Sequence, residues 1–480
     1  MSRKTIGMAA AIVVLGGGAA VGGVLWHRSN QAHAAWAAAQ PAHPDVAGWP
    51  AEFRQRIDAL NTAVKQWPPN PAALGELTRL YLANGFQAEA ERGLRGLLVY
   101  DPANAHWPHY LASLVAGYGR LDEAISLWRK VAALDPKYAA ARLKLGEALL
   151  KTNQLDEAQA VYSDALAIAP QDPYALLGLA QVALRTGRWG AARDNLETAV
   201  AANSSFAAGY SLLATVWERL GDTESAERAR SKAKLLGRFK DLSDPWQDEL
   251  TRDCYDVYRL QVLAATLSAT GDAPAAITLL ERAIVVSPDD PRTHRQLGKI
   301  YLGLHEHAKA QAELERAIAL QPTEQAAYLD LINVFRATND RAAAIEWIKK
   351  GLKEMPHSAG IHFEMALALL AEGKPEEALP FLMKARDLDP DNVSADQQLA
   401  QAYFRMGREA EAVETMRAAL ARTPDNAPIV ALMVRYQIRS GNAADAEKYL
   451  MEAHQAGADE RTLGELVAEF QRRFGRLPRG

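Results

Sequence analysis

The chain has 480 residues, of which 49% are hydrophobic and only 7% aromatic, so alanine, leucine and valine supply most of the apolar volume. This composition suits close-packed helices and argues against disorder. Lysine plus arginine (54) nearly balance aspartate plus glutamate (58), and a net charge of -4 argues against a nucleic-acid partner. The single cysteine, Cys254, excludes an intramolecular disulfide framework and any site built from several thiolates.

The amino terminus contains an uncharged stretch that runs from Thr5 to Trp26. A helix of that length extends about 33 Å at 1.5 Å per residue, enough to cross a hydrocarbon layer about 30 Å thick. Residues 1–28 are therefore expected to be a membrane anchor, or else a secretory signal cleaved near Ala34, where small residues flank His33.

Both interpretations place the rest of the chain on the extracytoplasmic side of a membrane, the periplasm in a bacterium. The positive charges of Arg3 and Lys4 precede the apolar stretch, which favours that orientation. Residues 29–48, rich in alanine, proline and histidine, are expected to be a linker.

The rest of the chain is periodic, because alanine recurs at one constant step in each of two series. Leucine or methionine precedes each alanine at a fixed distance, as Leu77 precedes Ala90, and in most periods proline follows it at a fixed distance, as Pro102 does. The alanines are Ala90, Ala124, Ala158, Ala192 and Ala226 in the first series and Ala276, Ala310, Ala344, Ala378, Ala412 and Ala446 in the second. The prolines are Pro102, Pro136, Pro170, Pro288, Pro322, Pro356, Pro390 and Pro424.

This spacing predicts a pair of helices in each period. Helix A carries the leucine, a turn with glycine in most periods follows, and helix B carries the alanine and ends before the proline. The alanine is expected to lie where the two helices approach most closely, so a larger side chain there would overpack the crossing by about 1–3 kcal/mol. This rule predicts that Ala344→Leu destabilises the array and that the solvent-facing change Glu346→Gln does not.

The pattern resembles the tetratricopeptide repeat family, with the alanine at position 20 and the proline at position 32 of that motif. The resemblance covers eleven repeats, although tryptophan at the fourth position is missing and glycine at the eighth is present only as Gly146 and Gly298. The repeats begin at Pro71, Ala105, Ala139, Pro173, Ala207, Val257, Pro291, Gln325, Ala359, Val393 and Ala427.

The resemblance implies an all-α, right-handed α-solenoid. Residues 71–240 form repeats 1–5 and residues 257–460 form repeats 6–11, with capping helices expected within 49–70 and 461–480. The residues outside the repeats are too few for a catalytic domain, so we expect no enzyme activity and no cofactor. The close histidine pair His305 and His307 falls in an inter-helix turn and is not expected to bind a metal.

Residues 241–256 form an acidic and aromatic insertion between repeats 5 and 6, with Trp246 and Tyr255 among its acids. Helix B of repeat 5 has Arg238 in place of the proline and is expected to continue until it breaks near Asp244. We expect the insertion to be a hinge whose aromatic side chains fill the gap between the two groups of repeats, with Cys254 as a packed small hydrophobic residue. A docking element or a weak cation site is the alternative.

In the resembled family, positions 2, 5, 6, 9, 12 and 13 of helix A line an inner groove that binds ligands. Here those positions hold twelve basic residues and five acidic ones. Such an excess would attract an acidic segment, and the attraction would weaken with salt. The expected partner-binding residues, where the basic residues are densest, are Tyr258, Gln261, Arg292, Arg295, Lys299, Asn333 and Arg336.

The expected function is therefore a non-catalytic protein-interaction scaffold, held at a membrane, that binds an acidic or extended segment of a protein partner. One alternative is a factor for envelope or exopolysaccharide assembly or secretion that binds an acidic polymer in the same groove. A less favoured alternative is an accessory subunit of an enzyme complex.

Overall fold

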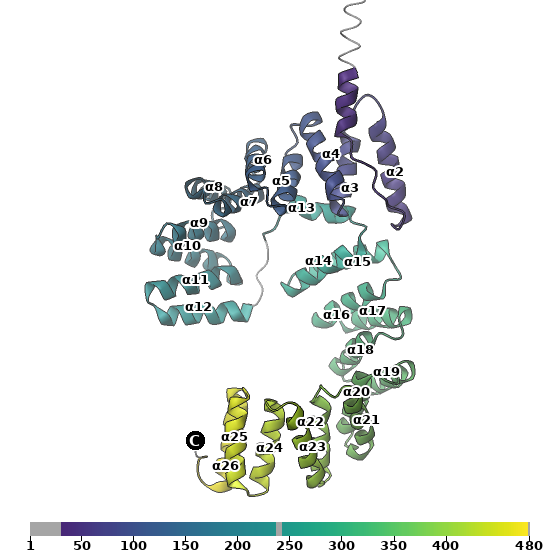
Figure 1. Cartoon of the computed structure of the whole chain (residues 1–480), viewed down its shortest axis with the longest axis vertical. Helices are drawn as coiled ribbons and strands as arrows, with labels where there is room; N and C mark the ends of the chain where they lie inside the picture. Colours follow the sequence, from purple (N-terminus) through teal and green to yellow (C-terminus); the bar gives the residue numbers. More distant parts are fainter. Residues whose placement is uncertain (1–29, 237–241, 479–480) are drawn as a thin grey trace, which may run out of the picture. The chain divides into compact units, whose positions relative to one another are not determined.

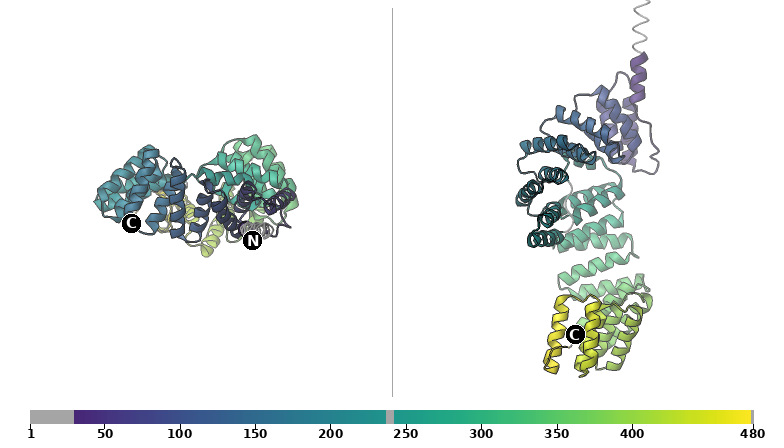
Figure 2. Two further views of the ribbon diagram at one scale, coloured as in Figure 1. Left: turned by 90° about the horizontal axis from the view of Figure 1, so that it is seen from above. Right: turned by 60° about the vertical axis from the view of Figure 1, so that its left-hand side comes forward.

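The computed structural model describes residues 30–236 and 242–478, and every regular element in that part of the chain is a helix. The expected anchor or signal, with its apolar residues 5–26, lies outside the described residues. The chain divides into two compact units, Met1–Pro288 (unit 1) and Asp289–Gly480 (unit 2). In each, consecutive helices form antiparallel pairs that stack one on the next (Figure 1), and Figure 2 shows the pairs from two other directions.

Unit 1 contains a helical segment at residues 30–39, helix α2 (Ala51–Lys65), six helix pairs and a short helical insertion. The helices of repeats 1–5 are α3 (Pro71–Ala83), α4 (Gln87–Tyr100), α5 (His106–Gly117), α6 (Leu121–Leu134), α7 (Ala139–Lys151), α8 (Leu155–Ile168), α9 (Pro173–Arg185), α10 (Trp189–Ala202), α11 (Ala207–Leu220) and α12 (Thr223–Leu236). The insertion contains α13 (Pro245–Leu250) and the 3₁₀ turn η1 (Thr251–Asp253), and repeat 6 follows as α14 (Val257–Ala269) and α15 (Ala273–Val286).

Unit 2 contains five helix pairs and a final single helix. They are α16 (Pro291–Gly303), α17 (His307–Leu320), α18 (Gln325–Ala337), α19 (Arg341–Glu354), α20 (Ala359–Ala371), α21 (Pro375–Leu388), α22 (Ser394–Arg405), α23 (Glu409–Arg422), α24 (Ala427–Arg439), α25 (Ala443–Gln455) and α26 (Glu460–Phe474).

The local signals that begin and end these helices are visible in the sequence. Each A helix begins at the first residue of its expected repeat, or one residue later in repeats 2 and 10. The A helix of repeat 1 has a proline in its first turn, and the side chain of Asn70 accepts a hydrogen bond from the backbone N–H of Ala73. Where the expected proline is present, the B helix ends two residues before it, as α4 does before Pro102.

The turn between the two helices of every repeat contains one residue with a positive φ. Eight of the eleven turns use glycine for it, from Gly85 at φ 84° to Gly441 at φ 76°. The other three turns use Asn153, His305 and Asn339, with φ between 57° and 60°. His305 is therefore a turn residue, the role that glycine has elsewhere, and asparagine tolerates the same conformation.

The alanine at the helix crossing is buried in ten of the eleven repeats. The exception is Ala344, which is partly exposed and lines a cavity between α18, α19 and α20. The expectation that Ala344→Leu overpacks its crossing is therefore wrong, because open space lies beside that alanine. Ala158 and Ala378, by contrast, are fully buried in their pairs.

The phenol ring of Tyr162 explains why glycine occupies positions 146 and 178. A Cβ atom added at Gly146 would lie 2.6 Å from the Tyr162 ring, and one added at Gly178 would lie 2.2 Å from it. Tyr162 on α8 thus packs directly against the backbones of α7 and α9, which only glycine permits.

Residues 30–48, placed in the expected linker 29–48, are folded in the structure. Residues 30–39 are helical, and Trp36 is buried with its indole N–H donating to the carbonyl of Val64 at 2.9 Å. Ala39 lies against Gly96, where an added Cβ would come within 2.7 Å of the Ala39 methyl group. This segment packs on α2 and α4 because tryptophan and small alanines give it an apolar face.

The insertion folds back onto the first repeats of unit 1. Of the two aromatic residues, only Tyr255 contacts both the start of the array and repeat 6: its ring packs against Phe53 of α2 on one side and under the Arg282 guanidinium of repeat 6 on the other. Trp246 instead stacks on Tyr138, well within the first group of repeats. The expectation that both aromatic residues fill a gap between the two groups is thus wrong for Trp246. Cys254 is buried.

Candidate partner-binding surface

Three of the expected binding residues lie on α16 in unit 2. Arg292 and Lys299 are exposed and form no ion pair with the described residues. Arg295 is half-buried, with its Nε 3.0 Å from a carboxylate oxygen of Glu324 and its Nη1 3.3 Å from one of Asp330. Of the three residues on α16, Arg292 and Lys299 therefore have side chains that are available to a charged partner.

The two expected residues on α18, Asn333 and Arg336, are exposed and contact each other. Nη1 of Arg336 donates to Oδ1 of Asn333 at 2.9 Å, and its Nη2 forms an ion pair with Glu364 on α20. Arg295 and Arg336 are thus already paired with acids of neighbouring repeats, so they are less available to an acidic partner than Arg292 and Lys299.

The pKa of the Asp330 carboxyl group is subject to two opposing effects. Burial raises the pKa of Asp330, and the positive charges of Arg295 and Lys299 lower it by less. Its net pKa therefore lies above the ordinary value for aspartate.

The remaining two expected residues belong to unit 1 and differ in exposure. Tyr258 is 69% exposed, whereas Gln261 is buried on the same helix, α14. Gln261 is therefore less accessible than Tyr258 in this structure, and its contact with a partner stays a prediction.

A second cationic cluster of unit 2 lies at repeats 10 and 11 and was not singled out from the sequence. A cavity of about 310 Å³ separates two consecutive A helices, α22 and α24, and Arg405, Arg435 and Arg439 line it. The stacked rings of Phe404 and Tyr436, 5.6 Å apart, lie in the same cavity. Gln401 and Leu432 complete the lining, so it contains no acid.

The three arginines of this cavity differ in their partners. Arg435 forms ion pairs with Glu465 and Glu469 on α26, at 3.4 and 3.3 Å. Arg405 and Arg439 are exposed and have no ion pair within the described ranges. All three occupy inner-face positions of helix A, so the sequence contained the signal, but basic residues are denser along helix A of repeat 7.

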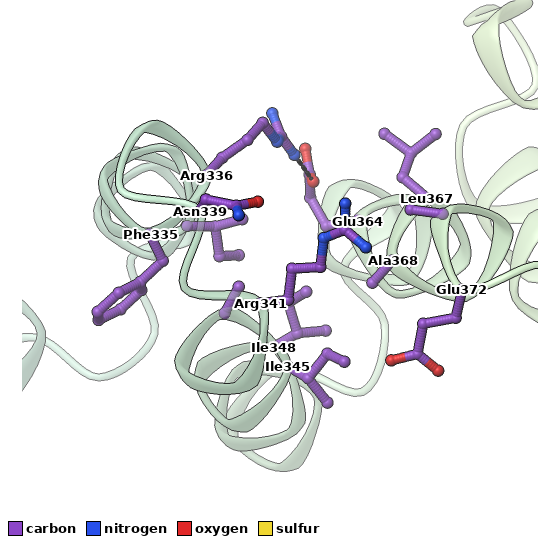
Figure 3. Close-up of a pocket in the computed structure, with 13 residues that line it drawn as sticks. Phe335, Arg336, Asn339, Arg341, Ile345, Ile348, Glu364, Leu367, Ala368 and Glu372 are labelled. Atoms are coloured by element: carbon purple, nitrogen blue, oxygen red, sulfur yellow. Dashed lines mark hydrogen bonds and ion pairs between the residues drawn. The ribbon is translucent and has the colours of Figure 1, made fainter.

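The cavity beside Ala344 has a different character. Its volume is about 280 Å³, and apolar side chains such as Ile345, Ile348 and Leu367 form much of its wall. Figure 3 shows Ile345 and Ile348 reaching from α19 and Leu367 and Ala368 lying on α20, with the Arg336–Glu364 ion pair at the edge. Alanine at the crossing leaves this space unfilled.

Neither a metal site nor a membrane-spanning helix is present in the part of the chain that the structure describes. No group of three or more histidine, cysteine, aspartate or glutamate residues there is arranged to hold a metal ion. No described helix combines the length and the apolar character that crossing a bilayer requires.

A family model described as "Tetratricopeptide repeat" matches residues 116–182, 156–216, 267–332 and 369–418. No curated protein matches the chain. Among solved structures, MamA is 22% identical over 34% of this chain and 94% of its own, with a TM-score of 0.31. YrrB, described as a TPR protein with an unusual peptide-binding site, is 19% identical over 39% of this chain and 96% of its own, with a TM-score of 0.32.

A third similar structure is pilF of Pseudomonas aeruginosa, which is 16% identical over 46% of this chain and 99% of its own, with a TM-score of 0.38. The segments that the family model matches contain helices α6–α10 with most of α11, α15–α17 with most of α18, and α21 and α22 with most of α23. The helix pairs outside those segments keep the same spacing and the same positive-φ turn. The chain therefore contains tetratricopeptide repeats over the segments that the family model matches.

Proposed function

We propose that this protein is a non-catalytic scaffold that binds an acidic segment of a protein partner along the inner face of unit 2. The observation that carries the proposal is the cavity between α22 and α24, where Arg405 and Arg439 lie beside the rings of Phe404 and Tyr436. Arginine recognises carboxylates through paired N–H donors, and the rings offer apolar surface to a neighbouring side chain.

The exposed cations of repeat 7 extend this surface. Arg292 and Lys299 lie on α16 of the same unit and have no carboxylate partner within the structure's described residues. A partner segment that neutralises them together with Arg405 and Arg439 would bind more weakly as salt concentration rises, because exposed charges are screened over about 8–10 Å at physiological ionic strength.

The test is charge reversal in the cavity. A fluorescein-labelled peptide of alternating glutamate and tyrosine serves as the probe, and its anisotropy is measured with the full chain and with the double variant Arg405→Glu, Arg439→Glu. We expect the double variant to bind at least ten times more weakly than the unaltered chain. Equal affinity for the two proteins would contradict the proposal.

A matched control separates local recognition from overall charge. Arg417 on α23 is an exposed arginine of the same part of the chain that lies outside the cavity. Arg417→Glu is expected to leave peptide binding within about twofold. If an acidic polysaccharide binds the cavity and the peptide does not, the alternative of an envelope or exopolysaccharide factor is favoured instead.

The proposal includes a membrane tether at residues 5–26, with the repeats on the extracytoplasmic side. Its support is the uncharged stretch preceded by Arg3 and Lys4. Cleavage near Ala34 is less compatible with the fold, because it would cut the helix at residues 30–39 two residues before buried Trp36. We expect the mature protein to stay in the membrane fraction with its original amino terminus, and a terminus beginning at Ala35 would refute the tether.

A further inference from the structure

Residues 242–256, here called the docked segment, lie on the inner face of repeats 1–3 within unit 1. In Figure 1 their helix α13 lies beside α3 and α5. The side chains that hold the segment include Arg79, His106, His109 and Tyr110. All four occupy helix A positions that line the inner groove in the resembled family.

The first anchor of the docked segment is Asp244. Its Oδ2 lies 2.8 Å from Nε2 of His109, and its Oδ1 accepts a hydrogen bond from the Tyr138 hydroxyl at 2.5 Å. His109 is fully buried, and Asp244 is only 5% exposed. A carboxylate removed from water in this way is stabilised by two partners, His109 on α5 and Tyr138 at the residue before α7.

Next to that acid, Trp246 is held between aromatic rings. Its indole lies 3.6 Å from the Tyr138 ring at an interplanar angle of 6°, and 4.0 Å from the His106 ring. The Tyr110 hydroxyl donates to the Trp246 carbonyl at 2.9 Å. Both the side chain and the backbone of this residue are therefore recognised.

The second anchor lies at the other end of the segment. Asp253 is buried, and its two carboxylate oxygens bind Arg56 at 2.9 Å and Arg79 at 2.8 Å. Asn84 binds the backbone here, because its Nδ2 donates to the Asp253 carbonyl at 2.8 Å and its Oδ1 accepts from the Tyr255 N–H at 2.6 Å.

We propose that the inner face of repeats 1–3 is a peptide-binding site whose present occupant is the chain's own segment 244–255. The site recognises an acid followed by proline and a large aromatic residue, then a second acid nine residues after the first and an aromatic residue two positions further. A partner segment with that pattern would bind here in place of the docked segment.

The repeat pattern indicates that the docked segment is bound to the array and is not one of its repeats. The docked segment belongs to the only interruption of the sequence period between repeats 1 and 11, and helix pairs α3–α8 are complete without it. The segment makes charged, stacking and backbone contacts that are specific to its residues. This binding surface is separate from the one proposed in unit 2, so either proposal can fail without the other.

The inner face continues beyond the docked segment as a cavity of about 640 Å³. Helices α7 and α9 supply Lys144, Glu147 and Gln181 to its wall, and α13 supplies Gln247 and Asp248. A competing peptide therefore has open surface directly beside the first anchor from which to approach the site.

The direct test measures binding of the segment as a separate peptide. The probe is a fluorescein-labelled peptide with the sequence of residues 242–256, and the proteins are the full chain and the full-length variant Asp244→Asn, Trp246→Ala. Because a tethered segment has an effective concentration in the millimolar range, it blocks its own site in the unaltered chain. We expect the variant to bind the peptide at least ten times more tightly than the unaltered chain does.

The matched control substitutes residues of the binding surface and uses the same labelled peptide. Adding Tyr138→Ala and Arg79→Ala to the variant is expected to weaken peptide binding at least tenfold. Equal affinity for the unaltered chain and the segment variant, or binding that survives loss of Tyr138 and Arg79, would overturn the proposal.

The reactivity of Cys254 provides a second measurement, which uses the unaltered chain and so does not depend on whether a variant folds. Cys254 is the only cysteine of the chain and is buried at the second anchor. An excess of the same peptide, made with serine in place of cysteine, is expected to increase the rate at which a thiol reagent modifies Cys254 at least fivefold in the unaltered chain. A control peptide, with alanine in place of the tryptophan and asparagine in place of both anchoring acids, should not increase that rate. Equal rates with the two peptides would contradict the inference.

Discussion

At the scale of single residues, the packing of each repeat depends on whether its crossing alanine has space beside it. Ala310 and Ala378 are fully buried between their helices, whereas Ala344 borders the apolar cavity of about 280 Å³. The same residue at the same motif position thus has two different environments, which a period read from the sequence does not distinguish.

This difference predicts opposite outcomes for one substitution. Ala310→Leu should lower the free energy of unfolding by about 1–3 kcal/mol, because its crossing has no room for three more carbons. Ala344→Leu should change it by less than about 0.5 kcal/mol or increase it, since leucine enters the cavity. Urea denaturation followed by circular dichroism measures both, and equal midpoints for the two variants would show that the cavity is closed in solution.

Asp244 predicts how docking depends on pH. Burial raises its pKa, but hydrogen bonds and charge from His109, with the Tyr138 hydroxyl, outweigh burial and leave the pKa below its usual value. A lowered pKa in the folded state means that the ionised carboxylate stabilises the fold above the unfolded pKa of about 3.9, and that this contribution is lost as pH falls through the folded pKa.

The corresponding measurement compares melting temperatures of the unaltered chain and Asp244→Asn. Their difference should persist down to about pH 5 and shrink below about pH 4, as Asp244 takes up its proton. A difference that keeps growing below about pH 4 would contradict the lowered pKa of Asp244.

At the scale of elements, the array ends in a helix that covers the last pair. Leu466 and Phe470 on α26 are fully buried and pack with Ile438 and Leu450, while Glu465 and Glu469 pair with Arg435. A terminal repeat with an uncovered apolar face would be unstable in water, so α26 is expected to stabilise repeat 11.

Phe470→Ala tests this contribution. Loss of a fully buried phenylalanine should reduce the stability of the last repeats by about 3–5 kcal/mol. Hydrogen exchange of α24 and α25 measures the loss, and the exposed neighbour Gln471→Ala is the control, with no expected change. Unchanged protection in the Phe470 variant would show that α26 does not hold the array closed.

The elements themselves follow from short-range signals that the sequence displays. Proline after helix B, glycine in the turn and alanine at the crossing are local, so the helix boundaries can be predicted within about one residue in most repeats. Asn153, His305 and Asn339 show that three turns reach the same conformation without glycine. The folded residues 30–39 were not foreseen, because a short alanine-rich helix anchored by one tryptophan resembles a linker in composition.

The binding surfaces were harder to predict because they depend on contacts between residues far apart in the chain. Arg295 pairs with Asp330 and Arg336 pairs with Glu364 across neighbouring repeats, and a residue count does not show which basic residues are paired. Asp244 lies 135 residues from His109, and no periodicity relates an insertion to the helices on which it packs. Arg405 and Arg439 form no ion pair with any described residue because none of the residues that line their cavity is acidic. That lining comes from two repeats and is likewise not visible in a single period.

At the scale of the whole molecule, the protein combines two units of stacked helix pairs that differ in how their inner faces are occupied. Within unit 1, repeats 1–3 hold the chain's own segment through Asp244, Trp246 and Asp253. Within unit 2, exposed arginines line a cavity with no acid. A stack of this kind presents an extended surface suited to protein segments, and each repeat is stabilised mainly by its neighbours.

The measurement that tests this account most directly is site-specific photocrosslinking in the native cell. A photoreactive amino acid replaces Gln401, which lines the unit 2 cavity, or Glu414, an exposed residue of α23 outside that cavity. The account predicts a defined protein adduct from position 401, through an acidic segment identified by mass spectrometry, and none from position 414. No protein adduct at 401, or the same adducts from both positions, would contradict a scaffold that binds its partner on the inner face.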